Sequence, residues 1–400
     1  MKLIPTRPVT IYARQHGQIW FPQLHRHTDG TLFIYFQKGY DRNFSPFGRL
    51  SSTDHGRTWT EIEENVPRAM WPYSFDDGEL YEMDCYGVVD PKETDTAFHY
   101  GAWSFPGLPE RVTRHELVRV HSPHTVNFPA TAMGVSYPTH PWWDLINRVH
   151  GKSEVTGDEL SYNCLTFFRF LEHDGALLAL AAGADRTHYS AGKSPAHATT
   201  SMFCFESRDR GRSWTERAVV ARGRPDLPEG FSEGTMVQLK DGQFYCVIRT
   251  GGPFYHVWSN DGGRTWTQPE LFRLSDTGEK IGMCWPCVRV CADGTLVMVW
   301  GRHGKHMAFD PSGTGKQWQS RLDLHAWELD TQALMGVPAE RRLRGDTLRA
   351  HRHLDSGDML SLVETEPHTF LVCYDVQAYC ESWNSPKCDA AIRMVRVRLE

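Results

Sequence analysis

Three eight-residue stretches share the pattern Ser-x-Asp-x-Gly-x-(Ser/Thr)-Trp: Ser52–Trp59 (STDHGRTW), Ser207–Trp214 (SRDRGRSW) and Ser259–Trp266 (SNDGGRTW). Each predicts a self-contained turn. The carboxylate accepts backbone N–H bonds, the glycine takes a conformation that other residues resist, and the tryptophan anchors the turn. We call these segments Asp boxes. A degenerate fourth box ends at Trp318, with Gly313 in the position of the aspartate. We expect the boxes to have a structural role, because function must be argued from a site.

Short apolar strands joined by tight turns recur along the whole chain. Four hairpins carry an Asp-Gly turn, the strongest short hairpin signal, and two variants have other turns. The six hairpins span residues 24–34, 87–98, 170–178, 237–245, 288–297 and 361–371. Their spacing of about 50 to 80 residues is slightly longer than that of typical propeller repeats. A last apolar strand, Ala391–Leu399, is expected to pair with the first segment and close the ring.

The repeats predict an all-β protein in which each unit supplies a small four-stranded sheet, and six such sheets arranged radially form a six-bladed β-propeller. Closure of the ring makes residues 1–400 a single domain. The main departure from even spacing is a long insertion at about 104–161, rich in Pro, His and Trp. We expect it to complete the second blade and then to fold over a site.

Composition excludes several classes of partner. The formal net charge is −6 and no run is dense in Lys or Arg, so nucleic acid is not an expected partner. No apolar run approaches the length of a membrane helix, and Met1–Pro8 lacks the apolar core of a signal peptide. We therefore expect a cytoplasmic protein that does not bind membranes.

Ten cysteines are spread along the chain, mostly within apolar strand-like runs, which indicates reduced core residues. The pair Cys284 and Cys287 has C-x-x-C spacing. A redox pair of this kind opens a helix, whereas this one lies in a predicted strand, and no second C-x-x-C is present to complete a zinc site. We predict neither a metal nor any other cofactor.

The Asp boxes resemble those of the sialidase superfamily of six-bladed propellers. The same turn occurs in exo-arabinanases, some polysaccharide lyases and noncatalytic propellers. The resemblance to sialidases implies that Glu233 and Arg249 correspond to a glutamate and a substrate-binding arginine of one inner hairpin. Arg302 corresponds to a further arginine that grips the substrate carboxylate.

Two features of true sialidases are absent. The sequence Trp20-Phe21-Pro22 stands where the family has Arg-Ile-Pro, so the first arginine is missing. The family's tyrosine nucleophile has no counterpart in residues 357–361. A sialidase mechanism that uses a tyrosine nucleophile is therefore not expected here.

Acidic residues precede inner-strand segments in three different repeats, where a propeller brings strand starts toward one pocket. They are Asp84, Glu233 and Asp358. Paired carboxylates in different environments serve as general acid and as base or nucleophile in glycosidic cleavage. We predict that at least two of the three are catalytic; the structural alternative is that they cap strand ends or bond to central backbone groups.

The remaining candidate residues would bind substrate. Arg249 and Arg302 suit a bidentate grip on the carboxylate of an acidic sugar. An aromatic platform for a sugar ring and a nearby imidazole are supplied by Trp20, Trp285, Tyr162 and His303. Each aromatic residue has core packing as its alternative role.

These residues predict an exo-acting glycoside hydrolase for a terminal, acidic sugar. Two alternatives remain open. A histidine beside Arg and Tyr can abstract a proton next to a uronate carboxylate, which would give a polysaccharide lyase on the same scaffold. The missing arginine and tyrosine favour a noncatalytic propeller that binds glycans or proteins. The sequence does not indicate the sugar, the linkage or the oligomeric state.

Overall fold

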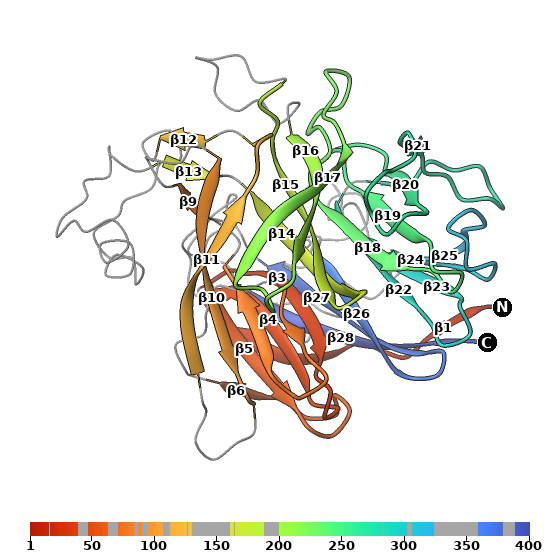
Figure 1. Ribbon diagram of the computed structural model, residues 1–400. Coiled ribbons are helices and arrows are strands. Elements are labelled where there is room, and N and C mark those ends of the chain that lie inside the picture. Colours follow the sequence, from red (N-terminus) through yellow and green to blue (C-terminus); the bar gives the residue numbers. More distant parts are fainter. Residues whose placement is uncertain are drawn as a thin grey trace. The chain divides into compact units, whose positions relative to one another are not determined.

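The computed structural model describes residues 1–15, 17–38, 47–62, 71–84, 87–89, 95–106, 113–125, 127–129, 161–163, 165–187, 200–282, 284–301, 306–323, 359–378 and 389–400. All regular structure in these ranges is β-strand (Figure 1). Within the same ranges, no helix is long and apolar enough to cross a membrane.

The strands form five sheets. One four-stranded sheet has the order β3 (Ile19–Arg26), β4 (Leu32–Lys38), β5 (Phe47–Ser52) and β6 (Thr60–Ile62). A second has the order β18 (Gly234–Gln238), β19 (Phe244–Ile248), β20 (Tyr255–Ser259) and β21 (Glu270–Leu271). A third has the order β22 (Cys284–Val290), β23 (Leu296–Gly301), β24 (His306–Asp310) and β25 (Gln319–Asp323).

The fourth sheet joins the two ends of the chain: β1 (Leu3–Pro5) and β2 (Val9–Arg14) both pair with β28 (Asp389–Leu399), which continues to β27 (Thr369–Ala378) and β26 (Leu360–Glu366). Leu3 lies opposite Leu399 in this register. Figure 1 shows the N- and C-terminal ends side by side, in red and blue. The predicted pairing of 391–399 with the first segment is confirmed.

The fifth sheet has eleven strands. Its members are β7 (Tyr73–Ser74), β8 (Leu80–Met83), β9 (Gly87–Val89), β10 (Thr96–Ser104), β11 (Thr113–His121), β12 (Asn127–Pro129), β13 (Ser161–Asn163), β14 (Thr166–His173), β15 (Ala176–Ala184), β16 (Thr200–Ser207) and β17 (Ser213–Ala221). Two antiparallel meanders, β7-β8-β10-β11 and β14-β15-β16-β17, meet where β11 pairs parallel to β17. Strand β11 falls inside the insertion expected at 104–161, and residues 130–160 lie outside the described ranges.

The chain divides into two compact units. The first comprises residues 1–66, 235–256 and 270–400, and the second comprises 67–234 and 257–269. In the first unit, alternate residues of β27 face two different cores. Leu371 and Cys373 pack with β3, β4 and β5, whereas Phe370 and Val372 pack with β22, β23 and β24. In the second unit, one core joins β8, β10 and β11 to β14–β17.

Each Asp box forms the same hydrogen-bonded turn between the third and fourth strands of a meander. In the box between β20 and β21, Asp261 Oδ1 accepts the Thr265 backbone N–H (2.9 Å) and Oδ2 accepts its hydroxyl (2.6 Å). Gly263 N donates to Ser259 Oγ (2.8 Å) and Trp266 Nε1 donates to Gly263 O (3.2 Å). The boxes that begin at Ser52 and Ser207 repeat these contacts.

The degenerate fourth box lies between β24 and β25. An aspartate that precedes the eight-residue motif takes the place of the missing one. Asp310, three residues before the Gly313 slot, accepts the backbone N–H of Ser312 (2.8 Å) and of Gln317 (3.2 Å). The Asp310 side chain is fully buried. The turn therefore keeps its carboxylate although the sequence pattern does not show it.

Each box also packs on a side chain from a neighbouring meander. A Cβ placed on Gly211 would lie 2.5 Å from the ring of Tyr81, and one on Gly315 would lie 2.5 Å from the ring of Tyr245. The Tyr81 hydroxyl donates to Gly211 O (2.9 Å), and Trp318 Nε1 donates to the Tyr245 hydroxyl (3.0 Å). The boxes thus tie adjacent meanders together, which agrees with the structural role expected for them.

Candidate functional site

Three strands that begin a meander contain a bulge with a strained backbone. The register shifts in β3 between Trp20 and Gln23, in β14 around Arg169, and in β22 between Cys284 and Cys287. At each bulge one non-glycine residue has a positive φ: Phe21 (56°), Arg169 (23°) and Trp285 (35°). Bulges re-aim side chains, and such strained residues gather at functional sites.

Two of these residues carry an additional constraint, because Phe21 precedes Pro22 and Trp285 precedes Pro286. The proline ring restricts the preceding residue to extended conformations, so a left-handed conformation there is doubly unfavourable. The surrounding sheet must therefore hold both residues in place. The repeated aromatic-Pro dipeptide is a sequence signal that could have indicated these two bulges.

The two strained aromatic residues belong to one group of rings in the first unit. The ring centroid of Phe21 lies 5.9 Å from that of Trp20 and 5.7 Å from that of Trp285. Trp20 and Trp285, predicted as the open platform for a sugar, are each only 3% exposed, whereas Phe21 is half-buried. The bulge in β3 turns Phe21 rather than Trp20 toward the more open side. Phe21 is therefore the ring that sequence reasoning missed.

Arg169, in the second unit, is the strained residue with a charge. Its guanidinium lies 4.9 Å from the ring centroid of Trp71, and its side chain is 8% exposed. Stacking on an aromatic face fixes a guanidinium in one orientation. Sequence reasoning missed this arginine because a bulge cannot be located without the register of the partner strand.

Asp84 lies where β8 ends and is 3% exposed. Its backbone N–H donates to Tyr100 O (2.8 Å), and its carbonyl accepts from His99 Nδ1 (3.0 Å). Glu82, two residues earlier and fully buried, shares its side of the extended chain. Sequence reasoning did not single out Glu82.

The two carboxylates affect their neighbours. Burial first, and then the negative charges of Asp84 and Glu82, raise the pKa of Tyr100 to about 12. Burial lowers the pKa of His99 to about 4, so this imidazole is neutral at physiological pH. The buried surroundings of Asp84 therefore contain two carboxyl side chains and an uncharged histidine.

Glu233 and Arg249 flank the hairpin of β18 and β19. Glu233 immediately precedes β18, and Arg249 immediately follows β19, its neighbour in the sheet. Both side chains are half-buried. The two residues therefore stand at the start and at the end of one hairpin, as the resemblance to sialidases implies.

The other predicted site residues are not placed. Asp358, Arg302 and His303 lie outside the described residues. For Tyr162 the structure describes only its backbone, in β13. Their roles remain predictions.

The cysteines described in the structure are free and buried: Cys204, Cys246, Cys284, Cys287, Cys291 and Cys373. Burial raises the pKa of the Cys204 thiol to about 12. Cys284 and Cys287 lie in strand β22, as expected, rather than at the start of a helix. The described cysteines are therefore buried thiols that form no disulfide with one another.

Neither a known protein-family model nor a curated protein sequence matches this chain. Solved structures do match. A protein of unknown function from Dyadobacter fermentans is 17% identical, with a TM-score of 0.60 over 100% of this chain and 99% of that chain. An α-L-arabinanase from Penicillium chrysogenum, solved with arabinobiose, is 13% identical, with a TM-score of 0.53 over 97% of this chain and 98% of that chain.

A sialidase from Trypanosoma rangeli, solved with the inhibitor DANA, has a TM-score of 0.49 and 12% identity; the match covers 95% of this chain and 55% of that chain. At these identities the likeness concerns the fold. The regular structure of the described residues is all β-strand, and the chain shares its fold with the arabinanase.

Proposed function

We propose that this protein is an exo-acting glycoside hydrolase that removes a terminal, acidic sugar. The observation that carries the proposal is the half-buried ring of Phe21, which packs against Trp285 and is held by strained aromatic-Pro bulges in two strands of one unit. The apolar C–H face of a sugar ring packs on an aromatic face, and strain of this kind persists where a site requires it. The fold shared with a propeller arabinanase supports the same class of reaction.

The catalytic groups are drawn from Asp84, Glu233 and Asp358. One carboxylic acid protonates the departing glycosidic oxygen, and a second carboxylate either attacks the sugar carbon or activates the water that does so. Arg249 and Arg302 bind the carboxylate of the sugar.

The architecture we propose is a six-bladed propeller. The eleven-stranded sheet counts as two blades, because it contains two complete four-stranded meanders joined only at their outer strands β11 and β17. With the four other sheets this gives six blades.

The test is the release of reducing sugar from sialosides, uronic-acid glycans and arabinan. We expect turnover of an acidic substrate, and a decrease in kcat of about 10²–10⁴-fold in Glu233→Gln. Glu229→Gln, four residues earlier in the same segment, is the matched control and should keep its activity. Arg249→Gln should raise KM for the acidic substrate, because it removes a charged contact.

Each other outcome points to a different function. Formation of a conjugated double bond, seen as new ultraviolet absorbance, would replace the hydrolase by the uronate lyase. Glycan binding without turnover would indicate a noncatalytic propeller. The absence of both turnover and binding on all three substrate classes would contradict a carbohydrate function.

A further inference from the structure

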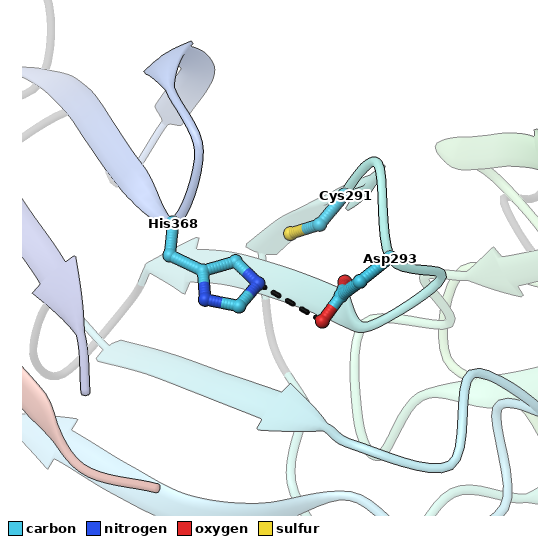
Figure 2. Close-up of side chains that lie close together, drawn as sticks. All are labelled: Cys291, Asp293 and His368. Carbon is cyan, nitrogen blue, oxygen red and sulfur yellow. Dashed lines mark hydrogen bonds and ion pairs between the residues drawn. The ribbon is translucent and has the colours of Figure 1, made fainter.

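Three potential metal ligands converge from two hairpin turns of the first unit. Cys291 and Asp293 lie in the turn between β22 and β23, and His368 lies in the turn between β26 and β27. Asp293 and His368 are 75 residues apart in sequence. Figure 2 shows the Cys291 sulfur, the Asp293 carboxylate and the His368 ring pointing toward one another.

The donor atoms are already close to a coordinating arrangement. One ligand atom from each residue lies within 4.8 Å of the other two, and His368 Nε2 is 3.0 Å from Asp293 Oδ2. Ligands of a tetrahedral zinc ion, bound at 2.0–2.3 Å, lie about 3.3–3.8 Å from one another. Small side-chain rotations would therefore bring the three donor atoms to the distances of a zinc site.

The turns around the three residues are independently fixed. Asp293 Oδ1 accepts the Thr295 backbone N–H (2.9 Å), and the His368 N–H donates to Glu364 Oε1 (2.7 Å). Both hairpins also share one hydrophobic core, which includes Cys291 itself, 3% exposed. The backbone positions of the ligands thus depend on packing and turn bonds rather than on the His–Asp contact.

The local charge favours a cation. The carboxylates of Asp293 and Glu364 both interact electrostatically with the Cys291 thiol. Lys240 Nζ donates to the Asp293 backbone carbonyl (3.3 Å). A divalent ion would offset the two negative charges.

We propose that Cys291, Asp293 and His368 bind a transition-metal ion of the zinc class, which joins the tips of two hairpins. A thiolate is a soft donor and an imidazole a borderline one, and together with a single carboxylate they suit zinc rather than magnesium or calcium, which require oxygen ligands. A fourth position remains for water. The site is structural: it lies in the turns that follow β22 and β26, at the opposite ends of these strands from the Cys284 bulge and from Leu360.

The experiment is a titration of the tag-free, metal-stripped full chain with Co²⁺, followed by displacement with Zn²⁺. We expect one equivalent of Co²⁺ to produce a sulfur-to-cobalt charge-transfer band in the near ultraviolet, which Zn²⁺ abolishes. Saturating Zn²⁺ should raise Tm by a few degrees, because the ion binds only the folded chain. Cys291→Ser should remove the band, and His368→Asn should weaken Co²⁺ binding at least about 100-fold.

His173→Asn is the matched control, because His173 Nε2 lies 3.2 Å from Asp174 Oδ2 at another hairpin tip. It should leave the band unchanged. Asparagine is used at position 368 because it tolerates the positive φ of 58° found there. If Cys291→Ser does not fold, the partly exposed His368 still decides the question. Absence of the band in the wild type, or its full persistence in His368→Asn, would overturn the proposal.

Discussion

The residue that follows each Asp-box aspartate has a left-handed backbone. His55 (φ 59°), Arg210 (φ 60°) and Gly262 (φ 70°) occupy this position, and a glycine with φ between 78° and 87° follows each of them. The sequence pattern predicts the glycine. It does not predict the side chain that packs on it, such as Tyr81 on Gly211, because that partner lies 130 residues away.

Gly211→Ala should destabilise the protein more than Gly242→Ala. Both glycines have φ of +87°, so alanine meets the same backbone strain, about 1–2 kcal/mol. A Cβ on Gly242 meets no atom within 4 Å, whereas one on Gly211 would lie 2.5 Å from the Tyr81 ring. Gly211→Ala therefore costs a further ~1–3 kcal/mol. Urea unfolding of the two variants measures the difference, and equal midpoints would show that the Tyr81 contact is unimportant.

Sequence periodicity predicted the elements better than their irregularities. All six hairpins have paired strands, including β26 and β27 in the variant at 361–371. The bulges at Phe21 and Trp285 were not predicted, because a bulge is defined by the register of two strands and either strand alone looks regular. Trp20, which the sequence predicts as part of a platform for a sugar ring or as a core residue, is almost fully buried. The sequence pattern of the fourth box likewise does not reveal its carboxylate. Gly313 stands in the position of the aspartate, and Asp310 supplies the carboxylate instead.

The Asp boxes should make the protein sensitive to acid. Desolvation alone would raise the pKa of Asp261, but hydrogen bonds from Thr265, Ser259 and Arg264 outweigh it and lower the pKa to about 2. A carboxylate with a lowered pKa in the folded state stabilises the fold above its ordinary pKa of 3.8, and this stability is lost as pH falls toward 2. We expect the urea midpoint to fall between pH 5 and pH 2.

Asp261→Asn should lower stability by about 1–2 kcal/mol at pH 7 and should flatten this part of the pH profile. Asp241→Asn, at a hairpin tip where the aspartate accepts a bond from the Gln243 N–H (3.0 Å), is the comparison. An Asp261→Asn profile as steep as that of the wild type would assign the acid sensitivity to other groups.

For the whole molecule, the sequence predicted that the last strand returns to the first. The sequence predicted less of the candidate site, because a site depends on the positions of several repeats at once. Glu233 and Arg249 were found through their shared hairpin, and Asp84 through its place in one repeat. Glu82, Arg169 and the Cys291–His368 pair needed the structure, since no spacing in the sequence relates them.

A cross-link should test the pairing of the chain ends. Ile4 and Arg398 lie opposite each other in β1 and β28, and both are exposed. The double variant Ile4→Cys/Arg398→Cys should form a disulfide on oxidation and gain about 3–5 kcal/mol, because the bond closes a loop of almost the whole chain. Thermal unfolding with and without reductant measures the gain, and Ile4→Cys alone is the control. No difference between the oxidised and reduced forms would argue against this register.

The position of β28 also sets an order of events during synthesis. β28 is an inner strand of its sheet: it pairs with β27 along one side and with both β1 and β2 along the other. β1 and β2 therefore lack a partner until β28 has left the ribosome. The eleven-stranded sheet, which ends at Ala221, needs no later residue for its own pairing. A nascent chain can therefore complete that sheet while its first fourteen residues wait, with unpaired edges, for the final step.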